Sequence, residues 1–522
     1  MQACRSEGLS VKSGLRDSRG ARRIYKRNRG RQCLQDNRCE PGGMKMRTAV
    51  ILAAGDGSKL WPYAEIRPKA MVPIANKPIA VHQTELLHEL GFERIIIAGG
   101  RMSEQLKNAF ERHAATTGIR LPVTVVRTQA SEPRGTAYSL YAVAEHTGDE
   151  SFLVLYGDTL LEKSDVLRLM DRFAAGGGSA AALVSPLGEQ NSRDWLCSKL
   201  SAAADPASTA ADLEVTGIMG HPRDGGYTHR FCAFAFAQPF LRYCASNSGL
   251  FTSVQVGMMP PSEGHLEMSL ADWMADGHPL LAVEVQGGFF DIDKPWHILQ
   301  ANDWMVRRLC RSLTGHELSE GASIDDTAAV NGFVRLGPNS RIGKNVIVNG
   351  NIIVGRDTVI ENGAILQGDH VIGDETYIGN YCYLSAGSTV GNRCVINHCA
   401  ELDGIIMDTV YLYHYMEFYG IIGTGTDLGA ATVCGTLRFD DGDTSHRIRG
   451  RRETPREHAN AVYLGDYVRT GVNAILMPGV KVGINSIVGP GVLLQEDVPN
   501  RTIISLKQEH DVKAWGPERY GW

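Results

Sequence analysis

The first residues with chemical potential lie in a glycine-containing loop that follows an apolar run. The stretch AVILAAGDGSKLWPYAEIRPKAMVP, residues 49–73, carries Gly55 and Gly57 and then Lys59 and Lys69. Because glycine has no Cβ, the backbone N–H groups of such a loop can approach phosphate oxygens closely. The two lysines could neutralise phosphate charge beside it. The stretch therefore predicts a phosphate-binding site.

Two common phosphate-binding motifs do not fit this loop. A P-loop requires a lysine followed by Ser or Thr, but Lys59 is followed by Leu60. A dinucleotide-binding loop requires G-x-G-x-x-G, and Leu60 occupies the position of its third glycine. The loop must therefore serve another kind of phosphate chemistry.

The elements that position this loop alternate between strand-like and helix-like patterns over residues 46–304. Strands that alternate with helices of this length predict an α/β domain with a Rossmann-like, mostly parallel sheet. Ligands bind at the carboxyl ends of such strands, where both the loop and the sequence LYGD are expected. The expected strands are 47–55, 92–100, 121–128 and 151–158, and the expected helices are 76–91 and 103–114.

A six-residue repeat begins at Ser323. Its period predicts a left-handed parallel β-helix over 321–505, whereas a β-sandwich would show a period of two. Aliphatic residues recur at Ile324, Val330, Leu336, Ile342, Val348, Val354, Ile360, Leu366, Ile372, Ile378, Leu384, Val390 and Ile396, and after an interruption at Ile422, Leu428, Leu464, Leu476, Val482, Val488 and Leu494.

The remaining segments complete the organisation of the 522-residue chain. Residues 1–45 carry nine Arg and three Lys against four acidic residues, which predicts a disordered basic extension. We expect a linker helix over 305–320 and a C-terminal tail over 506–522. The 11 cysteines form no C-x-x-C pair, and no apolar run is long enough to span a membrane, so we expect a cytoplasmic protein.

Several motifs in order resemble those of the sugar-1-phosphate nucleotidyltransferase family. LAAGDGSKLWP…RPKAMVPIANKP resembles its opening motif, EPRGTAYSL its nucleobase loop, and VLYGD its metal-binding strand. EMSLAD and GGFFDIDKPWHILQAN resemble its sugar-side and closing segments. Followed by hexapeptide repeats, the chain is similar to the bifunctional N-acetylglucosamine-1-phosphate uridylyltransferases and glucosamine-1-phosphate acetyltransferases, in their archaeal-type form.

The resemblance implies transfer of a nucleoside monophosphate from an NTP to a sugar-1-phosphate, with release of pyrophosphate. It implies that Lys59 and Lys69 are catalytic and that Asp158 and Asp291 bind Mg²⁺, with Asp293 as an alternative ligand. The substrate-binding residues that it implies are Ala54, Gly55, Gly57, Gln129, Gly135, Thr136, Gly157 and Glu267.

The sugar side departs from the family pattern. Lys59 replaces an arginine, which removes a bidentate fork but keeps the charge. The E-K-P motif has no counterpart, since the nearest segment is GHPRDG, and the asparagine expected just before CAFAFAQPF is absent. An alternative is therefore a non-catalytic, sugar-nucleotide-binding regulatory or scaffold subunit with the same two domains.

The second domain resembles an acetyltransferase in part. His414 lies where the family has a general base, which would make acetyl-CoA a co-substrate, but the two sugar-phosphate lysines of the family are replaced by Leu402 and Ala459. The alternative is an assembly domain that builds a homotrimer or a higher homo-oligomer. We expect the basic insertion 445–458 to form a solvated loop, and we expect no nucleic-acid or membrane partner.

Overall fold

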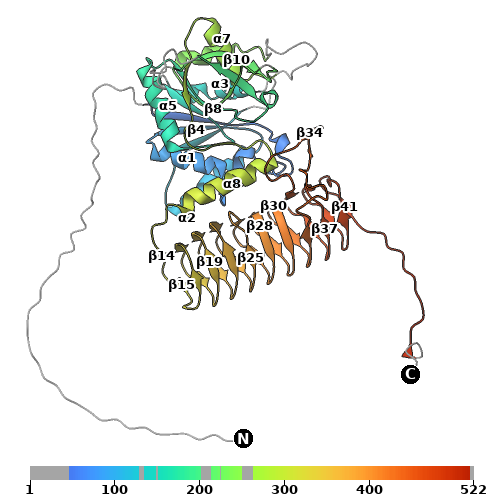
Figure 1. The fold of residues 1–522 in the computed structure, drawn as a ribbon. Helices are drawn as coiled ribbons and strands as arrows, with labels where there is room; N and C mark the ends of the chain where they lie inside the picture. The colour runs from blue at the N-terminus through green and yellow to red at the C-terminus, as the bar shows by residue number, and fades with distance from the viewer. Residues whose placement is uncertain are drawn as a thin grey trace, which may run out of the picture. The chain divides into compact units, whose positions relative to one another are not determined.

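The computed structural model describes residues 46–128, 135–148, 151–201, 213–223, 225–249 and 263–517. The predicted extension 1–45 lies outside the described residues. Met44–Trp522 group into one compact unit, which contains both an α/β sheet domain and a β-helix (Figure 1).

A nine-stranded sheet is the framework of the first domain. Its centre is parallel, with β1 between β4 and β6, and with β5 beyond β4 at the edge. The side chains of β1 alternate between two cores, with Val50 on one face and Ile51 on the other. Such a strand is apolar on both sides because both faces of the sheet are covered. These strands are β1 (Thr48–Ala53), β4 (Arg94–Gly99), β5 (Val123–Arg127) and β6 (Phe152–Tyr156).

The sheet is mixed, but seven of its nine strands run in one direction, as predicted, and β10 and β11 run in the opposite direction. β11 pairs antiparallel with β6, β8 and β9, and only β12 runs parallel to its neighbour β8. A separate two-stranded sheet joins β7 to β13. The strands are β7 (Thr159–Leu161), β8 (Ala180–Pro186), β9 (Leu196–Leu200), β10 (Val215–Gly220), β11 (His229–Phe236), β12 (Leu281–Glu284) and β13 (Phe289–Asp291).

Helices cover both faces of this sheet. One core receives apolar side chains from α1, α2 and α5, and the other receives them from α3, α6 and α7. The helices are α1 (Ile79–Glu89), α2 (Ser103–Thr117), α3 (Thr136–Tyr141), α4 (Ala144–Thr147), α5 (Lys163–Ala175), α6 (Leu241–Ala245) and α7 (Leu266–Ala275). None of the described helices is long and apolar enough to span a membrane.

The hexapeptide repeats form a β-helix of short parallel strands, from β14 (Glu317–Leu318) to β41 (Ile503–Ile504). The first coils stack on one another with an offset of 18 residues, as in the pairs Val334 with Ile352 and Ile352 with His370. The repeated aliphatic residues fill the interior, where Leu366 and Ile378 are fully buried. The predicted β-helix is therefore confirmed.

Helix α8 (Pro295–Cys310) joins the domains and begins ten residues before the predicted linker at 305–320. It starts at Pro295, which supplies the fixed φ that favours a first helical turn. Its Ile298 and Leu299 share a core with Tyr463 of the β-helix. The linker is thus a packed element of the interface.

The basic insertion is only in part the solvated loop that we expected: its arginines are exposed, but the segment is also anchored by buried residues. It contains a short hairpin of β33 (His446–Ile448) and β34 (Arg451–Glu453), in which His446 and Ile448 are buried. His446 packs against Trp296 of α8 and Tyr463. Apolar and aromatic contacts therefore hold this segment against the first domain.

Candidate active site

The glycine loop lies directly after β1, at the carboxyl end of the parallel strands. Gly57 has a φ of 66°, and a Cβ there would lie 2.8 Å from the Cβ of Ala64, so both the conformation and the space favour glycine. A Cβ at Gly55 would meet nothing within 4 Å. Together with Ala54, these residues form an accessible turn beside the sheet edge.

Lys59 and Lys69 flank the loop and share one carboxylate. Lys59 Nζ donates to Asp293 Oδ2 at 3.1 Å, and Lys69 Nζ lies 3.4 Å from Asp293 Oδ1. Lys69 also donates to Asp158 Oδ2 at 2.5 Å. Asp293, which the sequence suggested only as an alternative metal ligand, therefore connects both lysines.

Asp158 and Asp291 are brought together by main-chain pairing. Asp158 follows β6, and the backbone N–H of Ile292 donates to its carbonyl at 2.9 Å, while Asp291 pairs with Thr159. Gly157, which directly precedes Asp158, lies so close to β1 that a Cβ there would be 2.9 Å from the carbonyl oxygen of Leu52. Two strand ends thus place both predicted metal ligands in one region.

The ionisation of these carboxyl groups reflects their crowding. Burial, reinforced by the charge of Asp158, raises the pKa of Asp291 to about 7. Burial also disfavours the charge of Asp293, but Lys69 and Lys59 lower its pKa below the usual value. Burial disfavours the ammonium of Lys69 as well, yet the surrounding carboxylates raise its pKa. The charges of the three carboxyl groups and the two lysines therefore set the ionisation of Lys69, Asp291 and Asp293.

Arg230 is a residue that the sequence reasoning missed. It lies on β11, only 9% of its side chain is exposed, and its guanidinium is 3.9 Å from Asp291 Oδ2. The guanidinium lies over the rings of Trp195 and Phe289, at 4.2 and 4.7 Å from their centroids. A single arginine in the apolar strand HRFCAFAF was the available signal. It supplies a buried positive charge beside Asp291.

The expected nucleobase loop and sugar-side segment contact each other. Gly135 has a φ of 129°, and a Cβ there would lie 2.4 Å from the carbonyl oxygen of Gly264. Thr136 Oγ1 accepts from the N–H of Leu266 at 2.8 Å. Gln129, expected to bind the base, lies outside the described residues.

Glu267 is tied to the strand that carries Asp158. Its Oε1 accepts from the hydroxyl of Tyr156 at 2.6 Å, and burial together with Glu267 raises the pKa of that tyrosine. Gln83 of α1 donates to the carbonyls of Tyr156 and Thr159 and so fixes the turn between them. The sequence could have indicated a role for Tyr156, because this residue directly precedes the Gly-Asp pair that is expected to bind the metal.

His414 lies in the β-helix, after β29 (Tyr411–Leu412). Its ring stacks on His398, with centroids 5.1 Å apart and planes 11° apart, and meets Tyr415 edge-on. Among the described residues, none of its ring contacts is with the first domain. The structure therefore does not bring His414 together with Lys59, Lys69 and the aspartates.

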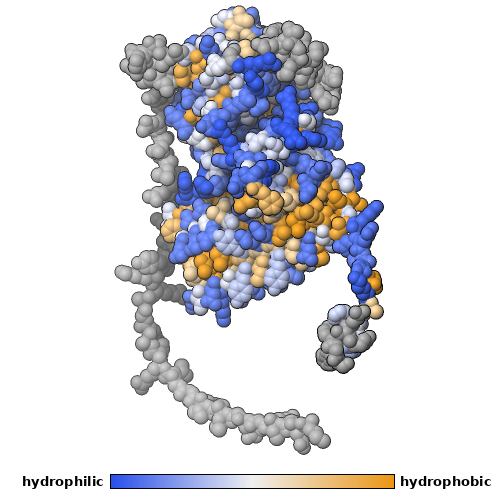
Figure 2. Space-filling view, turned by 45° about the vertical axis from the view of Figure 1, so that its right-hand side comes forward, coloured by the Kyte–Doolittle hydropathy of each residue, from blue (hydrophilic) through white to orange (hydrophobic). Residues whose placement is uncertain are grey.

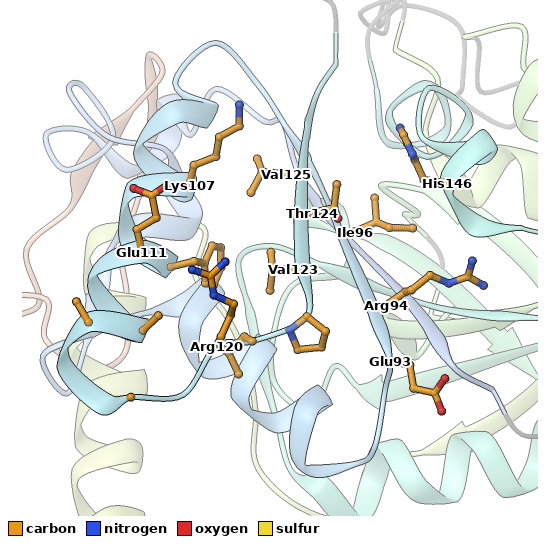
Figure 3. A pocket seen from close by; sticks show the side chains of 16 residues that line it. Glu93, Arg94, Ile96, Lys107, Glu111, Arg120, Val123, Thr124, Val125 and His146 are labelled. Atoms are coloured by element: carbon orange, nitrogen blue, oxygen red, sulfur yellow. The ribbon is translucent and has the colours of Figure 1, made fainter.

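A large surface cavity lies elsewhere on the first domain. It has a volume of about 990 Å³ and extends along the edge strand β5 and helix α2. Figure 3 shows its charged rim, which includes Glu93, Arg94, Lys107, Glu111 and Arg120. None of the predicted site residues lines it. Across the described ranges, no group of three or more His, Cys, Asp or Glu side chains forms a ready metal site.

Comparison with known families and proteins divides the chain in the same way. Residues 49–284 match the MobA-like NTP transferase domain, and residues 369–404 match the bacterial transferase hexapeptide (six repeats). The first domain is therefore similar to an NTP transferase domain, and part of the β-helix is similar to hexapeptide repeats.

Curated relatives share this whole plan. The chain is 27% identical over 475 residues to a bifunctional protein GlmU of Methanococcus vannielii, which covers 89% of this chain and 99% of that protein. It is 26% identical over 461 residues to a bifunctional sugar-1-phosphate nucleotidylyltransferase/acetyltransferase of Sulfurisphaera tokodaii, covering 86% and 98%. A solved UDP-glucose pyrophosphorylase complexed with UDP-glucose matches 51% of this chain and 100% of its own, with 15% identity and a TM-score of 0.44.

Proposed function

We infer from its NTP transferase domain and hexapeptide repeats that the protein transfers a nucleoside monophosphate from an NTP to a sugar-1-phosphate, releasing pyrophosphate. The observation that carries this inference is the cluster of Lys69, Asp158, Asp291 and Asp293 beside the glycine loop. Relatives with the same two domains, among them a sugar-1-phosphate nucleotidylyltransferase/acetyltransferase, support it.

The reaction needs positioned charge more than covalent chemistry. A phosphate oxygen of the sugar-1-phosphate attacks the α-phosphorus in line, the bond to the β-phosphate oxygen breaks, and pyrophosphate leaves. We assign Lys69, which is largely buried, to hold the sugar phosphate against the α-phosphate. The more exposed Lys59 neutralises the departing pyrophosphate, and the N–H groups near Gly55 and Gly57 bind the triphosphate.

The carboxylates fit a divalent cation. Asp158 and Asp291 offer hard oxygen ligands from adjacent strand ends, and burial together with the charge of Asp158 raises the pKa of Asp291. We propose these two residues as the Mg²⁺ ligands. When bound, Mg²⁺ neutralises phosphate charge and orients the triphosphate. Until then Lys69 stabilises Asp158, so this lysine is held close to where the phosphates must lie.

We assign recognition of the base and of the sugar to the two segments that contact each other at the starts of α3 and α7. Thr136 begins α3 and Gly135 directly precedes it, so we assign both residues, together with Gln129, to recognition of the base edge. We assign Glu267 to a sugar hydroxyl, because the hydroxyl of Tyr156 holds its carboxylate in place. These roles are proposals that substrate specificity will test.

A second activity, acetyl transfer from acetyl-CoA, is favoured by the paired imidazoles of His398 and His414. In that reaction His414 would take a proton from the amine of an amino sugar phosphate as the nitrogen attacks the thioester carbon. The thiolate of CoA leaves and the acetyl group remains on nitrogen. Release of CoA thiol with glucosamine-1-phosphate would test this activity.

The β-helix supports a homo-oligomer, which we propose to be a trimer. Figure 2 shows an apolar area on the face of the β-helix in view. Among its last coils, Leu493 is 52% exposed and Ile503 is 69% exposed, which is unusual for aliphatic side chains. Light scattering on the purified chain would give its mass in solution.

The nucleotidyl activity is tested by pyrophosphate release from the full chain with Mg²⁺. Four common NTPs are combined with a panel of sugar-1-phosphates, and Asp158→Ala serves as the control. We expect release that requires one sugar phosphate and is lost in the control. A chain that binds a nucleotide but turns over no pair would instead support the binding-subunit alternative.

A further inference from the structure

The loop that joins the two site lysines lies on the β-helix. Between Lys59 and Lys69, the indole N–H of Trp61 donates to Asn500 Oδ1 at 3.0 Å, and Asn500 donates to Glu65 Oε2 at 2.7 Å. The hydroxyl of Tyr63 donates to the carbonyl of Ile421 at 2.9 Å. The second domain therefore contacts this loop at several points along its length.

The strongest of these contacts is an ion pair between Arg67 and Asp466. Only 12% of the Arg67 side chain is exposed and Asp466 is fully buried. Asp466 Oδ1 also accepts from the backbone N–H of Thr424 at 2.7 Å, which fixes the carboxylate within its coil. A buried, hydrogen-bonded ion pair of this kind holds one geometry, because either charge left alone would be strongly disfavoured.

Arg67 is connected to Lys69 by one rigid residue. Pro68 lies between them with φ of −60° and ψ of 147°, and its ring fixes the first of these angles. Lys69 then begins a short helical turn, and its ammonium reaches Asp158 and Asp293. A shift of Arg67 would therefore also move the Cα atom of Lys69, because Pro68 leaves the backbone between them little conformational freedom.

A second contact with the β-helix lies next to Asp293, near the C-terminal end of the first domain's sequence. Lys294, which follows Asp293, pairs with Glu453 of the insertion hairpin at 2.8 Å, and only 8% of the Lys294 side chain is exposed. The β-helix thus holds the chain on both sides of the cluster, next to Lys69 and next to Asp293.

We propose that Arg67, held by Asp466, is a positioning residue for Lys69, and that the β-helix thereby completes the nucleotidyl site of the first domain. This inference rests on the proposed nucleotidyl transfer. It makes the second domain part of the reaction even if that domain has no activity of its own. A mere packing contact would instead stabilise the fold without setting the position of the lysine.

The test compares variants of the full chain by steady-state pyrophosphate release and by melting temperature. Arg67→Met should lower kcat by about 100-fold, since a displacement near 1 Å can cost this much. Arg67→Lys should recover part of the loss. The matched control is Asn76→Gly, which removes another contact between the domains. The side-chain amide of Asn76 donates to the Val390 carbonyl at 2.6 Å. Its backbone has a φ of 63°, which glycine tolerates. This variant should keep kcat within about twofold.

A double variant separates positioning from stability. Arg67→Met with Asp466→Leu leaves no buried charge unpaired, so the melting temperature should recover while kcat stays low. Recovery of kcat together with the melting temperature would overturn the proposal. An equal loss of kcat in Asn76→Gly would do the same.

One readout does not depend on turnover. Acetic anhydride acetylates free amines, so mass spectrometry can measure how fast Lys69 reacts in the chain without substrates. We expect faster acetylation of Lys69 in Arg67→Met and an unchanged rate in Asn76→Gly. Equal rates in all variants would contradict the proposal. A wild-type chain that turns over no substrate pair would refute the proposed function alone, because the labelling still reports the position of Lys69.

Discussion

The two candidate sites of this chain differ in how their key residues are held. Lys69 lies in an ionic network with Asp158 and Asp293, and elements from distant parts of the sequence fix each member. His414 has aromatic neighbours, and the positions of the two lysines expected near it are the core residue Leu402 and the buried Ala459. The first arrangement suits the binding of several phosphates, whereas the second offers an imidazole stacked on another imidazole.

The largest effect should come from removing a member of the ionic network. Asp158→Ala removes a proposed metal ligand and the closest partner of Lys69, so we expect kcat/KM for pyrophosphate release to fall by about 10³-fold. The melting temperature of the variant serves as the control for folding. Activity within tenfold of wild type would show that the network is structural, and the contrast with His414 would disappear.

The pKa of Asp291 predicts a pH effect. It stands at about 7 in the folded chain, above the ordinary 3.8, because of burial and Asp158. Below pH 7 the carboxyl group is protonated and binds a cation poorly, so kcat/KM should fall about tenfold per pH unit. A flat profile between pH 5.5 and 7.5, measured at fixed Mg²⁺, would argue against a role for Asp291.

The same pKa has a consequence for stability with a definite sign. Between pH 4 and pH 7 the folded chain keeps a proton on Asp291 that the unfolded chain has released, so this group lowers stability as the pH rises through that window. Asp291→Asn removes the effect. In buffer without Mg²⁺ it should stabilise the chain by about 2 kcal/mol more at pH 8 than at pH 5, measured by denaturant unfolding. If the difference in unfolding free energy between Asp291→Asn and wild type is the same at pH 5 and pH 8, the raised pKa of Asp291 is contradicted.

Lys59 should matter less than the buried members of the network. Its side chain is 42% exposed, against 13% for Lys69, so solvent screens its charge more. We expect Lys59→Ala to lower kcat/KM by about tenfold, and Lys59→Arg to keep it within about threefold, because an arginine preserves the charge. Added pyrophosphate should inhibit Lys59→Ala more weakly than wild type, whereas its inhibition of Lys59→Arg should be unchanged.

His414→Ala should leave pyrophosphate release unchanged, since the ring contacts of His414 lie within the β-helix. The same substitution should abolish any CoA release with glucosamine-1-phosphate. A fall in pyrophosphate release would mean that the two sites are coupled.

The sequence predicted the elements with strong periodic signals. The six-residue period of Leu366 and Ile378 became the β-helix interior, and β1 became the central buried strand before the glycine loop. Asp158 could be placed at the carboxyl end of a parallel strand, where ligands bind in such sheets, whereas Asp291 reaches the same region through the separate pair of β7 and β13. Local pattern was sufficient in these cases.

Contacts made across long stretches of chain were not predictable in this way. Arg230 reaches Asp291 only through the antiparallel placement of β11, and Glu453 reaches Lys294 only because the insertion folds back on α8. The charge of segment 445–458 predicted solvent exposure, but His446 packs against Trp296. Such pairings depend on how the domains pack, which no local pattern encodes.

The most direct test of nucleotidyl transfer follows the attacking oxygen. Sugar-1-phosphate labelled with a heavy oxygen isotope in its phosphate is incubated with the full chain, NTP and Mg²⁺, and the products are analysed by mass spectrometry. We expect an NDP-sugar that carries the label and pyrophosphate that carries none. Formation of NDP and phosphate from the NTP, or label in the pyrophosphate, would contradict it.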